Sequence, residues 1–363
     1  MKDDGRRFLA THNALRGFAA LAVFAYHLQL DPLHRLPLGP AAPLIERGYL
    51  WVDFFFLLSG YVLSMSYLDP LGGGGLREAG AFLRARIARI VPMHLAALGL
   101  LALLVVVLDP TQRGLGGAHF WSFLDRPSYG YLALQSALLQ VWNYPATVSW
   151  NIPSWSISAE MHVYLLLPLL AWATVRRPRL VPWGMVAAST LIYAFIFVTR
   201  PTLDILDPLA ILRCLAGFLL GVAMQRWRGV WAGSIDHWAS FFQFVALAGL
   251  FAVLLASRHD VFAIPFFALL VAATAGDRGV LAKALDWRGW QALGRTSYSV
   301  YLLNFPVLLA GDAIWAAWAG ADTSVVARVA GDLMLTGTLL AMAALSFRSI
   351  EDPARRALRP DDR

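Results

Sequence analysis

Charged residues are scarce in this chain, and cysteine is nearly absent. Asp, Glu, Lys and Arg make up 15% of its 363 residues, whereas a soluble domain uses about 25% to cover its surface. The chain therefore cannot coat itself with charge as a soluble domain does. The single cysteine, Cys214, stands in an apolar run, which excludes an intramolecular disulfide and a metal cluster built from thiolates. We expect no bound metal and no tightly bound cofactor.

Apolar residues take the place of the missing charge. The composition is 58% hydrophobic, the mean hydropathy is +0.58, and the apolar runs approach the ~20 residues that span a hydrocarbon core. These runs predict an all-α polytopic membrane protein. The isoelectric point near 9.8 could suggest a nucleic-acid partner, but basic cytoplasmic loops explain it in a membrane protein. We therefore expect membrane lipids, and no nucleic acid, as partners.

Ten apolar segments predict ten transmembrane helices, near residues 9–30, 48–68, 90–108, 154–175, 182–199, 206–225, 238–256, 261–276, 292–318 and 325–347. A further segment over 129–142 is too short to span comfortably. We expect a short or re-entrant helix there, within a long outer loop over 109–153. Backbone that enters a membrane without crossing it is tolerated only against protein or a wet cavity, so this segment indicates a cavity on the outer side.

The distribution of arginine predicts the orientation. If the N-terminus is cytoplasmic and 129–142 does not cross, most of the 30 Lys and Arg face the cytoplasm, including "RRPR" at 176–179 and the C-terminal tail. This arrangement satisfies the positive-inside rule. We expect both termini in the cytoplasm and one membrane domain over 1–363, with no appended soluble domain. The first helix lacks a clear small-residue cleavage site, so we expect it to stay in the mature chain.

Two polar residues interrupt the first apolar segment. Arg16 and His27 are eleven residues apart, so on a helix they project from nearly the same face, about 16 Å apart along the axis. Arg16 alone could snorkel to the interface, and His27 alone could be a satisfied core histidine. Together they indicate the two ends of one polar track through the bundle.

A pair of arginines precedes the third apolar segment. Arg86 and Arg89, in "RARIARIVP", are three residues apart and share one helix face, near the helix end whose dipole favours anions. That arrangement suits a ligand with phosphates. Positive-inside anchoring explains the same pattern, and spacing alone favours the anchoring interpretation.

The fourth segment carries Glu160 within an apolar run, where a carboxylate needs a partner. Pairing with His27 would orient the imidazole for work as a general base. The alternative partner is an arginine such as Arg213, in a structural ion pair.

Other polar or aromatic residues in these segments could line a cavity. In the ninth segment, Pro306 should kink the helix and free the carbonyl of Leu302, and the neighbouring Asn304 could line a cavity or hold helices together. The candidate cavity-lining residues are Asp53, Ser59, Trp155, Tyr164 and Asn304.

Six motifs follow one another along the chain, from residue 15 to residue 353. They are "LRGFAALAVFAYHL", "VDFFFLLSGYVLS", "RARIARIVP", "WSISAEMHVYLLLP", "SYSVYLLNFPV" and "SIEDP". Together, and in this order, they resemble the acyltransferase-3 family of membrane acyltransferases. One such motif is a weak signal, whereas six in order over nearly the whole chain are specific.

The resemblance implies an enzyme, an acyl-CoA-dependent O-acyltransferase of the bacterial cytoplasmic (inner) membrane. Members take an acyl group, usually acetyl, from cytoplasmic acetyl-CoA or another acyl-CoA and deliver it to a hydroxyl, often on a cell-surface carbohydrate. His27 matches the family's catalytic histidine, a general base or acyl carrier, and Arg16 its partnered arginine. Arg86 and Arg89 match an R-x-x-R pair that would hold the CoA phosphates. Glu160 matches the Glu of the W-S-x-x-x-E motif.

Two features depart from the family's pattern. Asn304 stands where many members have His, and many members carry an esterase-like domain after the helices. We expect transfer here to be completed within the membrane domain or by a partner. Two other functions stay open: a transporter or flippase of a lipid-linked or acylated substrate, and O-acylation of a small hydroxylated metabolite.

Overall fold

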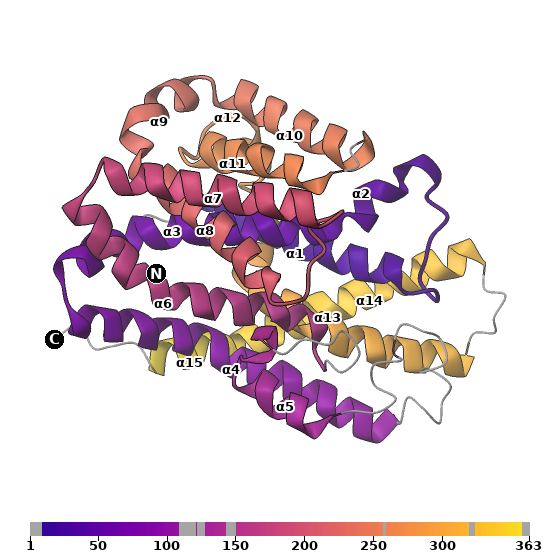
Figure 1. Ribbon diagram of the computed structural model, residues 1–363. Helices are drawn as coiled ribbons and strands as arrows, with labels where there is room; N and C mark the ends of the chain where they lie inside the picture. Colours follow the sequence, from indigo (N-terminus) through magenta and orange to yellow (C-terminus); the bar gives the residue numbers. More distant parts are fainter. Residues whose placement is uncertain are drawn as a thin grey trace.

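The computed structural model describes residues 9–108, 121, 128–142, 150–256, 259–318 and 324–357. Throughout these ranges the regular elements are helices, which confirms the predicted all-α class. The long helices lie side by side in one bundle (Figure 1).

Ten helices correspond to the ten predicted apolar segments. They are α1 (Ala10–Leu30), α3 (Trp51–Gly73), α4 (Leu76–Leu108), α6 (Trp155–Arg176), α7 (Leu180–Thr199), α8 (Leu209–Arg226), α10 (Ala239–Ala256), α11 (Ala263–Thr274), α13 (Arg288–Trp318) and α14 (Val325–Ser346). Shorter helices connect them: α2 (Ala42–Glu46), α5 (Tyr129–Ser136), α9 (Arg228–His237), α12 (Gly279–Ala284) and α15 (Asp352–Ala357). Single turns lie at η1 (Gly39–Ala41), η2 (Gly48–Leu50), η5 (Gln140–Trp142), η6 (Ile152–Ser154), η7 (Asp260–Phe262) and the π-turn η8 (Phe347–Glu351).

Within the described residues, eight helical stretches are long and apolar enough to cross a membrane. The helices α1 and α11 are not among these eight. The first turns of α1 carry polar residues such as His12, Asn13 and Arg16, and α11 has 12 residues. The count of ten crossings and the cytoplasmic termini therefore stay predictions.

Large apolar side chains cover the outside of the bundle. Val106 of α4, Val198 of α7, Phe244 of α10 and Leu333 of α14 are all exposed. Soluble proteins seldom expose contiguous apolar surface of this kind, whereas lipid is a matching solvent for it. This surface and the eight apolar helices indicate an integral membrane protein.

The segment over 129–142 forms a short helix, as the sequence predicts. Its helix α5 has 8 residues, about 12 Å of length, too little to cross a bilayer. It lies against α4, where the imidazole of His94 is 2.7 Å from the carbonyl oxygen of Gln135. The surrounding loop, 109–153, which the sequence predicts on the outer side, lies largely outside the described residues.

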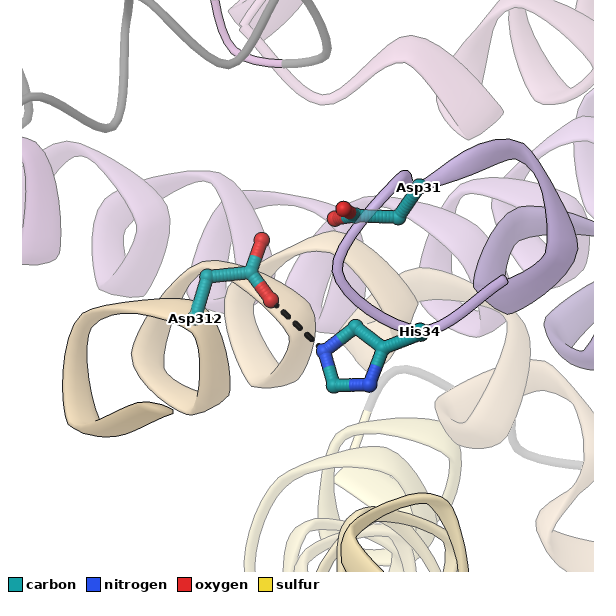
Figure 2. A group of neighbouring side chains, drawn as sticks. All are labelled: Asp31, His34 and Asp312. Atoms are coloured by element: carbon teal, nitrogen blue, oxygen red, sulfur yellow. Dashed lines mark hydrogen bonds and ion pairs between the residues drawn. The ribbon is translucent and has the colours of Figure 1, made fainter. Parts of the chain in front are cut away.

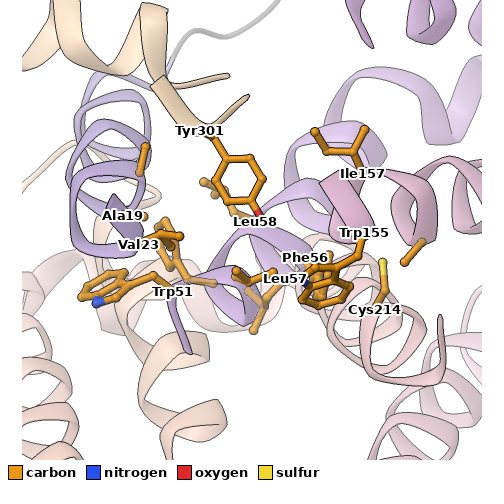
Figure 3. Packing of buried hydrophobic residues seen from close by; sticks show 14 of the residues in the cluster. Ala19, Val23, Trp51, Phe56, Leu57, Leu58, Trp155, Ile157, Cys214 and Tyr301 are labelled. Atoms are coloured by element: carbon orange, nitrogen blue, oxygen red, sulfur yellow. The ribbon is translucent and has the colours of Figure 1, made fainter. Parts of the chain in front are cut away.

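Glycines let α3 and α8 approach at backbone distance. A Cβ atom on Gly60 would lie 2.1 Å from the carbonyl oxygen of Phe218, and one on Gly221 would lie 2.0 Å from that of Leu57. Small residues at such crossings give close backbone packing in membranes. Figure 3 shows the apolar side chains around this crossing, where the rings of Phe56 and Trp155 are 5.9 Å apart.

The pairing of α1 with α13 positions the candidate site. A Cβ on Gly17 would lie 2.8 Å from the backbone nitrogen of Gly294, so the two helices touch through their backbones. Further along α13, Pro306 lies inside the helix, and the carbonyl of Leu302 accepts a hydrogen bond from the side chain of Asn151, at 3.0 Å. The prediction that Pro306 frees this carbonyl is confirmed, and Asn151 satisfies it.

Candidate functional site

A cavity of about 230 Å³ opens between α1, α3, α4, α6 and α13. Arg16 of α1, Arg86 and Arg89 of α4 and Glu160 of α6 all line it. These residues come from three motifs that are far apart in the sequence, and the bundle brings them to one space.

The cavity is elongated along α3. Its lining includes Met65 at one end of this helix segment and Val52 at the other, thirteen residues or about 20 Å apart along the helix axis. Ser59 lies between them and is 2.9 Å from the hydroxyl of Tyr164, which also lines the cavity. The space therefore has the length of an extended chain rather than of a compact ligand.

Its arginines lack carboxylate partners. Among the described residues, Arg16, Arg86 and Arg89 form no ion pair with an acid. Arg86 is 9% exposed, donates to the hydroxyl of Tyr67 at 3.3 Å, and leaves its Nε buried without a hydrogen-bond partner. A buried cation without a counter-charge is costly, so this wall of the cavity is suited to an anionic ligand.

Two further charged residues border this cluster and were missed as site residues. Glu351 in η8 is 2% exposed, accepts a hydrogen bond from Ser299 at 2.9 Å, and acts electrostatically on Arg16. Arg355, one turn later, is 4.0 Å from Glu351 and also acts on Arg16. The closing motif "SIEDP" was the available signal, since it contains Glu351.

His27 lies outside the lining of this cavity. It is 8% exposed, and its Nδ1 is 3.0 Å from the side-chain nitrogen Nδ2 of Asn304. Its ring packs edge-on against Phe305, with 5.1 Å between the ring centroids. The predicted contact with Glu160 is not present, because Glu160 faces the arginine cavity. The imidazole is held by the side chain of Asn304 and by a hydrogen bond to the backbone of Val23.

The pairing with Asn304 decides which nitrogen of His27 can act as a base. A neutral imidazole has one N–H and one lone pair, and an amide can present either its NH₂ or its oxygen to Nδ1. When the oxygen of Asn304 accepts from Nδ1–H, Nε2 keeps its lone pair and can take a proton. The structure places the amide nitrogen Nδ2 toward Nδ1 and leaves Oδ1 buried without a hydrogen-bond partner, so this pairing requires the amide to be turned over.

Tyr301 is the cavity-lining residue nearest in sequence to Asn304 on α13. Its hydroxyl is 2.8 Å from that of Ser156 and 2.9 Å from the carbonyl oxygen of Pro153. Asn304 follows three residues later on the same helix, so Tyr301 and Asn304 share a face of α13. The far end of the cavity is thus one helical turn from the histidine.

Three of the predicted lining residues lie outside this cavity: Asn304, which contacts His27, and Asp53 and Trp155. Asp53 and Arg213 form an ion pair at 2.6 and 3.0 Å, and both side chains are fully buried. The guanidinium of Arg213 also lies 5.3 Å from the ring centre of Trp155. Neither Asp53 nor Trp155 lines the arginine cavity. Arg213 therefore pairs with Asp53 rather than with Glu160.

Comparison with known families agrees with this arrangement. Residues 11–346 match a family model described as "Acyltransferase domain". The chain belongs to the acyltransferase-3 family. The predicted resemblance is confirmed, and with it the membrane character of the chain.

Several named relatives are similar along nearly all of this chain. Acyltransferase MdmB of Streptomyces mycarofaciens is 27% identical over 96% of the chain and 92% of its own length. Peptidoglycan O-acetyltransferase OatA of Listeria monocytogenes is 22% identical over 97% of the chain, and putative peptidoglycan O-acetyltransferase YrhL of Bacillus subtilis is 21% identical over 98%. The chain spans 56% of the length of each of these two proteins. No solved structure matches the chain.

Proposed function

We propose that this protein is an O-acyltransferase that moves an acyl group, acetyl in the first instance, from acyl-CoA to a hydroxyl of a carbohydrate. One observation carries the proposal. The cavity holds three arginines without carboxylate partners at one end and reaches within one helical turn of the Asn304–His27 pair at the other. Family membership supports the reaction class.

The donor would bind through its phosphates. Arg16, Arg86 and Arg89 offer guanidinium groups that recognise phosphate through paired hydrogen bonds, and the orphaned Nε of Arg86 supplies a donor that needs an acceptor. The donor enters from the cytoplasm, where the positive-inside rule puts the start of α4. Its pantetheine arm then lies along α3, toward Tyr301.

His27 performs the proton transfer. Nε2 removes the proton from the acceptor hydroxyl while the oxygen forms a bond to the thioester carbonyl carbon. The C–S bond then breaks, and the imidazolium returns its proton to the departing CoA sulfur. Movement of Tyr301 joins the cavity to His27 for this step. If His27 carries the acyl group covalently instead, mass analysis of protein quenched without acceptor will find an added acetyl on the peptide containing His27.

The names of two relatives support a carbohydrate acceptor. OatA of Listeria monocytogenes is named a peptidoglycan O-acetyltransferase and YrhL a putative one, and for this chain we place the transfer on the outer side of the membrane. The acceptor reaches His27 from the ends of α1 and α13 that lie away from the arginines. We propose the bacterial cytoplasmic membrane as the location.

The donor site is tested by comparing arginines of one helix. Arg86→Gln and Arg89→Gln should each raise the KM for acetyl-CoA about 10- to 100-fold, because each loses a charge-assisted contact to phosphate. Arg84→Gln is the matched control, since Arg84 is exposed on the same helix. Equal KM values in all three variants would refute the donor site.

A transporter or flippase is the rival function. It predicts that purified protein in vesicles moves substrate without consuming acyl-CoA. An O-acyltransferase releases one CoA thiol for each acyl group transferred, and Cys214 is buried, so a thiol reagent reports CoA directly. Substrate movement without thiol release would favour the transporter.

A further inference from the structure

A cluster of titratable side chains lies at the end of α1 that is remote from Arg16. Asp31 follows the last residue of α1, His34 is in the loop after it, and Asp312 is on α13. They come together from positions almost 300 residues apart, and their exposures are 1%, 1% and 0%. Figure 2 shows the two carboxylates and the imidazole facing a common point.

The cluster is held firmly by its surroundings. His34 Nε2 donates to Asp312 Oδ1 at 2.8 Å, and His34 Nδ1 donates to Asp332 of α14 at 2.7 Å. The other oxygen of Asp312 accepts from the indole N–H of Trp121. Gln29 exchanges two hydrogen bonds with the backbone of Leu36, which fixes the loop that carries His34.

Negative charge exceeds positive charge in this cluster. Three carboxylates (Asp31, Asp312 and Asp332) surround one imidazole, and among the described residues no lysine or arginine pairs with any of them. Asp31 Oδ1 accepts from the backbone N–H of Leu33 at 2.9 Å, but its Oδ2 is buried without a donor. The carboxylate of Asp31 points toward that of Asp312 (Figure 2). Buried carboxylates facing one another need either a shared proton or a cation between them.

We propose that Asp31, His34 and Asp312 bind a divalent metal ion of the zinc type. Each residue offers one ligand atom, and these atoms lie within 4.8 Å of one another. Bonds of about 2.0–2.2 Å to nitrogen and oxygen ligands place neighbouring ligands about 3–3.5 Å apart, so a small contraction closes the site. His34 gives up its Nε2 proton on binding and keeps the bond from Nδ1 to Asp332, which orients the ring.

The ligand set selects the ion. One imidazole nitrogen with two carboxylate oxygens suits Zn²⁺, or Mn²⁺ with added water, whereas Ca²⁺ and Mg²⁺ prefer oxygen ligands throughout. The sequence did not predict this metal site, because Asp312 is distant in sequence from Asp31 and His34. The only local signal is the D-x-x-H spacing, which is too short to predict a site.

The bound ion would link the end of α1 to α13 close to His27, the proposed catalytic residue. Asp31 is one helical turn beyond His27 on α1, about 6 Å along the axis. Trp121, which donates to Asp312, packs against Phe305 with 5.4 Å between their ring centroids. Phe305 in turn packs against His27, with 5.1 Å between their ring centroids. Metal binding therefore ties α1 to α13 where these helices hold His27 against Asn304, and the ion itself does not touch substrate.

The first experiment measures metal content. Full-length protein without a polyhistidine tag is placed in phosphatidylcholine nanodiscs, equilibrated with Zn²⁺, dialysed and analysed by elemental mass spectrometry. We expect about one Zn²⁺ per chain, with Mn²⁺ as a weaker competitor and no effect of excess Mg²⁺. Asp312→Asn should weaken Zn²⁺ binding by at least about 10-fold. Asp207→Asn, a carboxylate of another loop, should bind like the wild type. Failure of folded wild-type protein to retain Zn²⁺ would overturn the proposal.

The second experiment compares the melting temperatures of the wild type and the Asp31→Asn variant in EDTA and in Zn²⁺. Asp31→Asn removes one of the facing carboxylates and lets an amide donate to Asp312, so its melting temperature in EDTA should equal or exceed that of the wild type. Added Zn²⁺ should raise the Tm of the wild type and leave that of Asp31→Asn unchanged. If instead a shared proton holds Asp31 and Asp312 together, the wild type will melt at the same temperature in Zn²⁺ and in EDTA, which contradicts the metal site.

Discussion

At the scale of single residues, the central pair is Asn304 with His27. In the proposed mechanism Nε2 of His27 is the base, and Nδ1–H donates to the side-chain oxygen of Asn304. Asn304→Leu should therefore lower kcat about 10- to 150-fold, the cost of one hydrogen bond to a charged group, with little change in the KM for acetyl-CoA. Asn304→Asp keeps the acceptor oxygen and should recover most of the loss. If the Asp variant is as slow as the Leu variant, Asn304 does not orient His27 in this way.

The buried pair of Asp53 and Arg213 gives a second prediction at this scale. Asp53→Ala leaves the guanidinium of Arg213 buried without its counter-charge and should lower the free energy of unfolding by about 3–5 kcal/mol. Asp207→Ala breaks the exposed pair with Arg200 and should cost less than about 1 kcal/mol. Unfolding in mixed detergent micelles measures both, and similar losses would contradict a structural role for Asp53.

Site residues differ in how well the sequence predicts them. The spacing of Arg16 from His27, and of Arg86 from Arg89, follows from the helical period, so their shared faces could be predicted. The partner of each buried polar group could not, because Asn304, Arg213 and Glu160 each had several acceptable partners and only packing selects among them. Glu160 was assigned to His27 by similar depth along the helix, a criterion that ignores rotation about the helix axis.

At the scale of helices, the approach of α3 to α8 limits substitution. Gly221→Ala places a Cβ against the backbone of Leu57, which cannot move aside as a flexible side chain can. We expect overpacking to cost about 1–3 kcal/mol, measured as a lower Tm. Gly99→Ala is the control, since a Cβ there meets nothing within 4 Å and alanine favours helix. Equal melting temperatures of Gly221→Ala and Gly99→Ala would show that α3 and α8 can move apart at no cost in stability.

Most helix positions were predicted, because long apolar runs can form little else in a membrane. The start of α4 was not: the helix begins at Leu76 rather than near residue 90, so Arg86 and Arg89 lie in its interior and not at the end whose dipole favours anions. The short α5 was also predicted, since its length excludes a crossing. Whether α1 and α11 cross the membrane is harder to predict from their length and hydropathy. Both have protein rather than lipid around much of their surface, as the many buried residues of α1 illustrate, and a helix covered by other helices tolerates polar residues and reduced length.

At the scale of the whole molecule, the orientation in the membrane is a prediction of the positive-inside rule. Pro178 and Pro201 lie at opposite ends of α7, and both are exposed. In a Cys214→Ala background, Pro178→Cys should react with a membrane-impermeant thiol reagent only from the cytoplasmic side, and Pro201→Cys only from outside. Reversed labelling in intact cells would invert the proposed donor and acceptor sides.

We propose that His27 is the base in the transfer of an acyl group from CoA to a hydroxyl. The most direct measurement gives purified protein isotope-labelled acetyl-CoA and surface glycans, and follows labelled O-acetyl product and free CoA together. For the wild type the account predicts equal amounts of both. For His27→Gln it predicts a loss of at least about 100-fold in rate, as expected for a missing general base, with CoA binding retained. Near-normal transfer by folded His27→Gln would contradict the account.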